Sequence, residues 1–165
     1  MQSEKFTALV RNAIGAAQSA ALAADHQKLT AEHVLAALLK DDNMTVKMLL
    51  AKAGADSASL SALLKAGLDK FPQVTGSGAG QLQLDADLAR ILAAVEAEAK
   101  ARHDQFIAVD LLLLGMTKST GSVGKILKKA GVEPAPLGAA IDEMRKGRTA
   151  DSDAAEDSYD ALSRY

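Results

Sequence analysis

The sequence predicts an all-α protein made of two four-helix repeats, related by a pseudo-twofold axis and packed together. Hydrophobic residues make up 48% of the 165 residues and aromatic residues only 3%. The core must therefore be built largely from alanine and leucine, which are strong helix formers. Apolar residues recur at helical spacing along the chain. The sequence also matches itself without gaps when shifted by 77 residues, which indicates an internal repeat.

Two stretches carry the repeat most clearly. LLAKAGAD, which starts at Leu49, falls on ILKKAGVE, which starts at Ile126. HQKLTAEHVL, which starts at His26, falls on HDQFIAVDLL, which starts at His103. A single four-helix unit of this size buries too little apolar surface to be stable alone, so we expect the two repeats to pack against each other.

Four helices are predicted in the first repeat. The first begins at Ser3, a residue type that caps helix N-termini, and the second follows Thr30, another capping residue. The third carries an apolar stripe and stops at Gly54, where a glycine can adopt the left-handed conformation that ends helices. The fourth spans residues 57–70 and ends before Pro72, because the residue that precedes a proline disfavours helix.

The second repeat restarts near Asp85, after the small-residue linker PQVTGSGAGQLQ, and its third helix stops at Gly131. Beyond Gly147 the apolar pattern fades, and from Thr149 on the chain has five acidic residues and one arginine. We expect a domain at residues 1–148, followed by a solvated acidic linker that can end in a short helix. The predicted parts are repeat one at 1–74, repeat two at 80–148 and the acidic linker at 149–165.

Composition disfavours several protein classes. The net charge is −2, whereas a nucleic-acid binder needs a basic face to neutralise phosphates. The chain has no cysteine, so disulfides and thiolate chemistry are not expected. No apolar run is long enough to span a membrane, and the N-terminus lacks the pattern of a secretion signal. We therefore expect a cytoplasmic protein with neither a nucleic-acid nor a membrane partner.

The stretch TGSVGKILKKAG, residues 120–131, contains a Gly-Lys pair and invites comparison with a phosphate-binding loop. That motif requires a glycine five residues before Gly124 and a hydroxyl residue after Lys125. The chain has Ser119 and Ile126 at these places, and a leucine-rich helical run precedes them instead of a strand. We expect a helix here and no bound nucleotide.

Metal, DNA and catalytic sites have little support in the sequence. His26 and His103 occupy equivalent repeat positions, which indicates turn-capping or exposed residues more than convergent metal ligands. No helix carries the basic, polar face of a DNA reader, and no nucleophile–base set can be identified. The predicted catalytic and metal sites are therefore none.

An interaction surface is the remaining possibility, and HDQFIAVD is its clearest candidate. There Asp104 replaces Gln27 of the first repeat, and Asp110 replaces His33. Asp110 lies near the start of a predicted helix, where free N–H groups can bind polar groups of a partner. It could equally serve only to complement the helix dipole, and the residues alone leave both roles open.

The whole chain resembles the Clp N-domain family, and within it the N-terminal domains of ClpB-type AAA+ disaggregases. The resemblance rests on FTALVRNAIGAAQSAALAADHQ, on the AGAD and AGVE helix ends, on KFPQVTGSG and on HDQFIAVDLLLL. It extends through MRKGRTADSDAAEDSYDALSRY, which is similar to the linker leading into the first ATPase module, a module absent from this chain.

The resemblance implies a binding module that is not itself an enzyme. Such domains bind exposed hydrophobic stretches of unfolded or aggregated proteins weakly and pass them to the central pore. A polar trio and an apolar groove form the contact surface in this family. By resemblance the trio is Thr7, Asp104 and Asp110, although many relatives have glutamate at the last position, and the groove includes Leu92 and Leu111. Two further groove positions are Ala94 and Glu98 here, which implies a shallower or more polar groove.

Cofactors and partners follow from the same resemblance. The fragment is expected to be a monomer without a cofactor, and the full-length protein a homohexamer that uses ATP and Mg²⁺ with a DnaK-type chaperone system. The alternative within the family is an adaptor-docking N-domain of a ClpA- or ClpC-type protease unfoldase. The ClpC-type phosphoarginine pattern has Thr-x-Glu-His in each repeat, whereas this chain has TAEH once, at Thr30 to His33, and IAVD in the second repeat.

Overall fold

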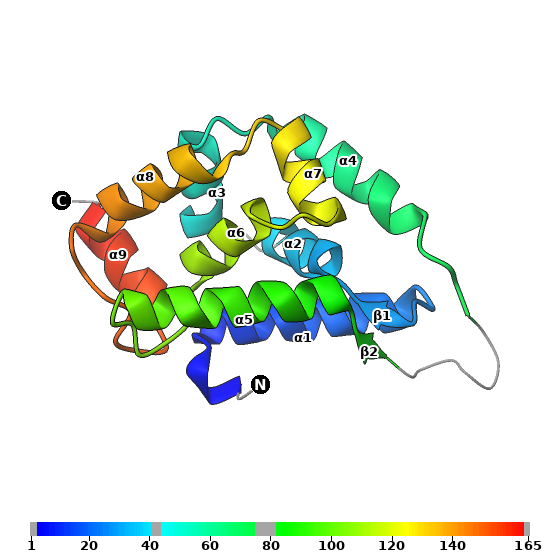
Figure 1. Cartoon of the computed structure of the whole chain (residues 1–165), viewed down its shortest axis with the longest axis horizontal. Helices are drawn as coiled ribbons and strands as arrows, with labels where there is room; N and C mark the ends of the chain where they lie inside the picture. The colour runs from blue at the N-terminus through cyan, green and yellow to red at the C-terminus, as the bar shows by residue number, and fades with distance from the viewer. Residues whose placement is uncertain (1–2, 41–43, 75–81, 164–165) are drawn as a thin grey trace.

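The computed structural model describes residues 3–40, 44–74 and 82–163 and confirms the all-α fold class (Figure 1). A short 3₁₀ helix, Ser3–Lys5, comes first, and two short strands, β1 (Lys28–Leu29) and β2 (Gln83–Leu84), lie between helices. The α-helices are, in order, α1 (Ala8–Ala23), α2 (Ala31–Lys40), α3 (Met44–Lys52), α4 (Ser57–Asp69), α5 (Ala86–Ala101), α6 (Val109–Thr117), α7 (Ser122–Lys129), α8 (Pro134–Arg145) and α9 (Ala155–Ser163).

Helices α1 to α4 correspond in order to α5 to α8. Within each repeat the first helix packs on the second, α1 on α2 and α5 on α6, whereas α3 packs on α8 and α4 on α7 across the repeats. In Figure 1, α1 and α5 lie along the bottom, and the two short helix pairs that cross between repeats lie at the top. The side chains at the centre belong to one continuous core, which includes Leu35, Leu38, Leu49, Leu60, Leu112, Leu113, Leu127 and Leu137.

Short extended segments of one repeat pair with extended segments of the other. β1, which precedes α2, pairs in parallel with β2, which precedes α5, so that Leu29 lies opposite Leu84. In the same way Phe6, which precedes α1, pairs in parallel with Ile107, which precedes α6. Each repeat thus supplies the hydrogen-bonding partner for a segment of the other.

The predicted stop glycines of the third helices meet at the repeat interface. Gly54 and Gly131 have φ values of +89° and +90°, a conformation that side chains other than glycine rarely adopt. A Cβ atom on Gly131 would also lie 3.1 Å from the Gly54 carbonyl oxygen. Both the backbone conformation and this close approach therefore require glycine at the predicted positions.

The first helix begins later than expected. It starts at Ala8, with Thr7 and not Ser3 as its N-cap, and the Thr7 side chain accepts a hydrogen bond from the Val10 N–H at 3.4 Å. The reason is the pairing of Phe6 with Ile107, which holds the chain extended just before the helix. Ser3 lies in the separate 3₁₀ helix.

The acidic segment also departs from the expectation that it is solvated. The side chains of Ala155, Glu156 and Tyr159 in α9 are buried, as is Ala150 before it. The Ala150 carbonyl accepts hydrogen bonds from the N–H groups of Gln105 and Phe106, which brings the chain back to the domain. Residues 75–81, in the middle of the expected inter-repeat linker, and residues 164–165 lie outside the described residues.

The Gly-Lys pair lies inside α7, as predicted. A Cβ atom on Gly124 would collide with the Ser119 carbonyl group, so helix packing alone accounts for this glycine. None of the helices in the described part of the chain is both long and apolar enough to cross a membrane.

Candidate functional site

An open groove of about 260 Å³ runs between α5 and α6. Apolar side chains of both helices form its walls, and polar side chains form its rim. Its apolar residues are Ile91, Ala94, Val95, Leu111, Leu114 and Gly115, and its polar residues are Asp87, Arg90, Glu98, Lys118, Ser119 and Thr120. A Cβ atom on Gly115 would collide with the Val95 side chain, so the helices approach closely there. The small, exposed Ala94 leaves the groove accessible.

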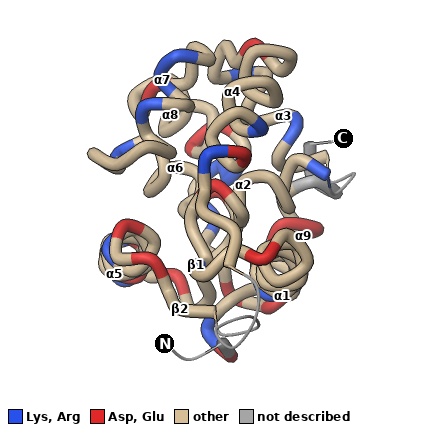
Figure 2. Tube along the Cα trace, turned by 90° about the vertical axis from the view of Figure 1, so that its right-hand side faces the viewer, with Lys and Arg blue, Asp and Glu red and all other residues tan. Residues whose placement is uncertain are grey.

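Leu111 and Leu92 lie in different hollows. Leu111 is only 1% exposed and lies in the floor of the α5–α6 groove. Leu92 instead lines a second hollow, of about 290 Å³, between α1 and α5, together with Phe6 and Leu84. Figure 2 views α1 and α5 nearly end-on, on either side of β2. The Leu84 side chain is 52% exposed at the edge of this second hollow.

Asp104 and Asp110, two members of the predicted polar trio, bind one buried arginine. Arg145 of α8 donates from Nε to Asp110 Oδ2 at 2.6 Å, from Nη2 to Asp110 Oδ1 at 2.9 Å and from Nη1 to Asp104 Oδ1 at 2.9 Å. The Asp104 and Asp110 side chains are fully buried, and that of Arg145 is 3% exposed. Although burial disfavours the charged guanidinium, its hydrogen bonds with Asp110 and Asp104 raise the pKa of Arg145 above its ordinary value.

The third member, Thr7, is bound to α9. Its hydroxyl donates to Glu156 Oε2 at 2.6 Å, and the same oxygen accepts from the Val109 N–H at 2.9 Å. Burial raises the pKa of the Glu156 carboxyl, and the bonds from Thr7 and Val109 offset part of that rise. The structure therefore brings the trio into one buried region under α9, which we call the polar cluster: Thr7, Asp104, Asp110, Arg145 and Glu156.

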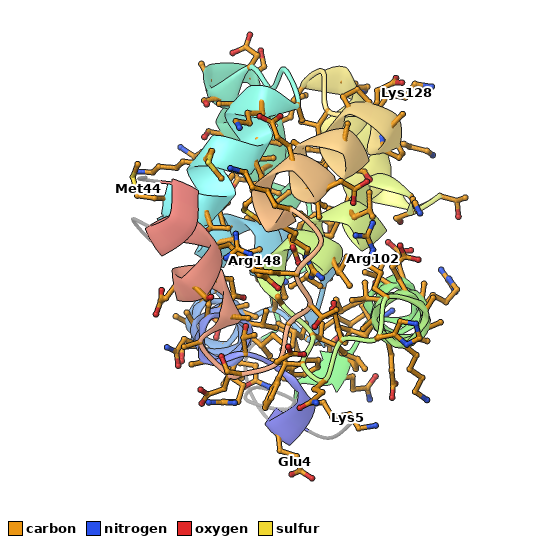
Figure 3. All side chains as sticks on the ribbon, turned by 90° about the vertical axis from the view of Figure 1, so that its left-hand side faces the viewer. Glu4, Lys5, Met44, Arg102, Lys128 and Arg148 are labelled. Atoms are coloured by element: carbon orange, nitrogen blue, oxygen red, sulfur yellow. The ribbon has the colours of Figure 1, made fainter. Side chains whose placement is uncertain are left out.

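Tyr159 of α9 covers the arginine side of the polar cluster. The Arg145 guanidinium carbon lies 5.3 Å from the centre of the Tyr159 ring, and that of Arg148 lies 5.7 Å from it, within the range of cation–π attraction. In Figure 3 the labelled Arg148 lies close to α9 and α8. Burial raises the pKa of the Tyr159 hydroxyl. The trio is thus inaccessible to solvent in this arrangement, in contrast to the open groove.

The sequence analysis missed Arg145, Glu156 and Tyr159. A signal for Arg145 was present, because it falls on Leu68 when the repeats are aligned. A charged residue at a repeat position that is otherwise apolar indicates a buried or functional charge. Glu156 and Tyr159 have no counterpart in the first repeat, so the repeat carries no signal for either.

The first repeat holds a histidine pair at the equivalent place. His26 was expected to be a turn-capping or exposed residue, but it is buried with its Nδ1 2.8 Å from His33 Nε2. The Thr30 N–H, which can only donate, lies 3.1 Å from His33 Nδ1. His33 Nδ1 is therefore an acceptor, and its proton lies on Nε2 facing His26. Burial is the main cause that lowers the pKa of His33 to about 4, and electrostatic repulsion from His26 is the second.

Comparisons with known proteins agree on one family. The family described as "Clp repeat (R) N-terminal domain" matches residues 5–147. "Chaperone protein ClpB" of Rhodopseudomonas palustris is 42% identical over 166 residues, which cover 100% of this chain and 19% of that protein. ClpB of Rhizobium meliloti matches with the same identity and coverage. The chain thus spans about a fifth of the length of these curated relatives.

Solved structures support the same fold. The Hsp104 N-terminal domain from Candida albicans superposes with a TM-score of 0.80 at 21% identity, covering 92% of this chain and 99% of that one. The N-terminal domain of the ClpV1 ATPase from E. coli superposes with a TM-score of 0.69 at 20% identity, covering 82% and 83% of the two chains. At these identities the likeness concerns the fold alone.

Proposed function

The chain belongs to the Clp repeat N-terminal domain family, and on that premise we propose that it is the client-binding module of a ClpB-type disaggregase. In this proposal it binds exposed hydrophobic segments of unfolded or aggregated polypeptides weakly and passes them to the pore of the full protein. The observation that supports the proposal best is the open apolar groove between α5 and α6, with Leu111 in its floor.

The groove has the chemistry that weak, unselective binding requires. Burying one client leucine contributes about 1.5–3 kcal/mol, which only partly offsets the free-energy cost of association. The rim carries both signs of charge, from Asp87 and Glu98 and from Arg90 and Lys118, so it favours no particular client charge. Weak binding suits a module that must release its client. We propose Leu92 and the neighbouring α1–α5 hollow as a second apolar contact.

Thr7, Asp104 and Asp110 remain proposed contacts for polar groups of the client. In the described arrangement their side chains are buried beneath α9, so contact with a client requires α9 to move. The groove and the polar cluster therefore make separable contributions, and each needs its own experiment.

For the whole protein we propose an AAA+ ATPase that uses ATP and Mg²⁺, assembles as a homohexamer and works with a DnaK-type chaperone system. Residues 149–165 would lead from the domain at 1–148 towards the ATPase module. The ClpA- or ClpC-type alternative has less support, since the curated relatives described above are ClpB chaperones. Glu32 of the TAEH stretch, moreover, is buried and accepts a hydrogen bond from Ser122.

A charge placed in the groove tests the proposal. Ala94 is exposed in the groove, so Ala94→Glu should keep the fold but place a carboxylate against any bound apolar segment. We expect the affinity for a fluorescent, leucine-rich unfolded peptide to fall by about tenfold or more, as burial of an unpaired charge costs well over 1.4 kcal/mol. Fluorescence anisotropy measures the affinity, and circular dichroism verifies the fold.

Ala97→Glu is the matched control. Ala97 is an exposed alanine on the same helix and is not among the residues that line the groove. Its substitution should leave the affinity within about twofold of wild type, as expected of surface changes away from a contact. Equal losses in the two variants, or an unchanged affinity in Ala94→Glu, would show that the groove is not the client site.

A further inference from the structure

The N-cap residue of α6 has no side chain that can cap the helix. In the first repeat the Thr30 hydroxyl accepts from the His33 N–H at 3.3 Å, and the Thr30 N–H donates to the His33 ring, so α2 is capped by its own residues. Thr30 falls on Ile107 in the second repeat, and the N-cap of α6, Ala108, makes no side-chain hydrogen bond. Within α6, Asp110 Oδ1 accepts from the Leu111 N–H at 2.7 Å, but the Val109 N–H at the first position of the helix needs an acceptor from elsewhere.

A carboxylate of α9 provides that acceptor. Glu156 Oε2 bridges the Val109 N–H and the Thr7 hydroxyl, and the positive end of the α6 dipole faces it. Asp110 is held by Arg145 and so does not take up these two donors. A hydroxyl, a backbone N–H and a helix N-terminus form a pocket that suits a carboxylate.

The attachment of α9 is imperfect in the part whose side chains the structure describes, residues 155–159. Ala155, Glu156 and Tyr159 are buried, whereas Asp157 and Ser158 are exposed. Within the described residues, two buried polar atoms have no hydrogen-bond partner, Tyr159 Oη and Asp104 Oδ2. Asp104 binds the Ala150 N–H and Arg145, so both atoms lie where the C-terminal segment meets the domain. A buried polar atom without a hydrogen-bond partner is unfavourable, which weakens the docked state.

Helix α9 also gains little from its own length. It has nine residues, whereas isolated helices shorter than about 12–15 residues are marginal in water. Its helical form therefore depends on docking. A short helix whose order depends on its docking is one that a competing ligand can displace.

We propose that α9 is a releasable lid, and that the pocket under it binds the side-chain carboxylate of an acidic segment of a partner polypeptide. Glu156 occupies this pocket from within the chain, and release of α9 frees Thr7 and the Val109 N–H. The pocket itself follows from the geometry, and only the partner's identity as a client rests on the proposed function. A client carrying an apolar stretch followed by an acidic residue would use the groove and the pocket together.

Hydrogen exchange of the wild-type chain tests release of the lid without any substitution. The Val109 N–H is protected by Glu156, and the Leu113 N–H lies inside α6. If α9 opens locally, the Val109 amide should be protected at least about 100-fold less than the Leu113 amide. Exchange at Val109 then requires only the release of α9, whereas exchange at Leu113 requires α6 to unfold. Equal protection of the two amides would mean that α9 leaves only on global unfolding, and the proposal would fail.

A peptide with the sequence of residues 152–163, blocked at both ends, tests the pocket in trans. The variant Glu156→Ala/Tyr159→Ala removes the two larger of the buried side chains described at residues 155–159 of the lid, and NMR follows the Thr7 and Val109 amides. We expect the peptide to bind this variant at least about tenfold more tightly than the wild type. In the wild type the tethered Glu156 competes for the pocket at a high effective concentration. A version of the peptide with glutamine in place of its glutamate should bind the variant much more weakly.

Matched controls separate the possible outcomes. Asp157→Ala/Ser158→Ala changes two exposed residues of the same helix and should behave as wild type. An acid-free peptide with a free C-terminal carboxylate shows whether a chain terminus can replace the side chain. Adding Ala94→Glu to the lid variant should leave peptide binding unchanged, so failure of the groove proposal does not affect this result. Equal binding to wild type and lid variant, or equal binding of the two peptides, would overturn the inference.

Discussion

Replacing Arg145 with leucine should lower the free energy of unfolding by about 3–5 kcal/mol, the cost typical of removing one partner from a buried ion pair. The loss would come from the carboxylates of Asp104 and Asp110, which are fully buried and would lose their arginine. Leucine itself should fit, because Leu68 occupies the equivalent position of the first repeat. Urea unfolding followed by circular dichroism measures the change.

Two further variants isolate the cause. Arg102→Leu removes an arginine whose partners, Glu98 and Asp142, are 36% and 69% exposed, so it should cost less than about 1 kcal/mol. The triple variant Asp104→Asn/Asp110→Asn/Arg145→Leu removes the buried charges together and should recover most of the loss. If Arg145→Leu costs no more than Arg102→Leu, the buried network does not stabilise the fold.

The histidine pair should make the protein less stable in mild acid. The pKa of His33 is about 4 in the folded chain, against 6.5 as its ordinary value, so the unfolded chain binds more protons between these pH values. The contribution of neutral His33 to the free energy of unfolding is therefore fully present above pH 6.5 and is lost as the pH falls towards 4. Between pH 7 and pH 5 we expect a loss of about 1–2 kcal/mol from this group, after allowance for solvent screening.

The test is a comparison of pH dependences, because carboxylates also titrate in acid. His33→Gln should remove most of this loss between pH 7 and pH 5, even if its stability at pH 7 is lower. His103→Gln changes the exposed histidine at the repeat position equivalent to His26 and should keep the wild-type dependence. Identical pH dependences in wild type and His33→Gln would rule out the histidine pair as the cause.

Features set by neighbouring residues could be predicted from the sequence. Thr30 starts a helix, and Gly54 and Gly131 end helices, because each acts through backbone groups only a few residues away. The apolar spacing and the internal repeat were enough to predict an all-α fold of two similar halves. The same repeat predicted that Gly124 lies inside a helix.

Features set by distant residues could not be predicted. Thr7 is a helix cap, and not part of a longer helix, because Phe6 pairs with Ile107. Thr7 also binds Glu156, which lies 149 positions away, and no local pattern predicts that contact. His26 and His103 share a repeat position but differ in burial, because His26 has His33 as its neighbour and the second repeat has Asp110 at that place.

The pairing of extended segments between the two repeats also affects how the chain folds. Helical proteins usually fold quickly because most of their native contacts join residues close in sequence. Here Phe6 and Ile107 must meet before either forms its bridge, and the chain between them has to close a large loop first. We therefore expect this domain to fold more slowly than helical proteins of similar size whose contacts are mostly local.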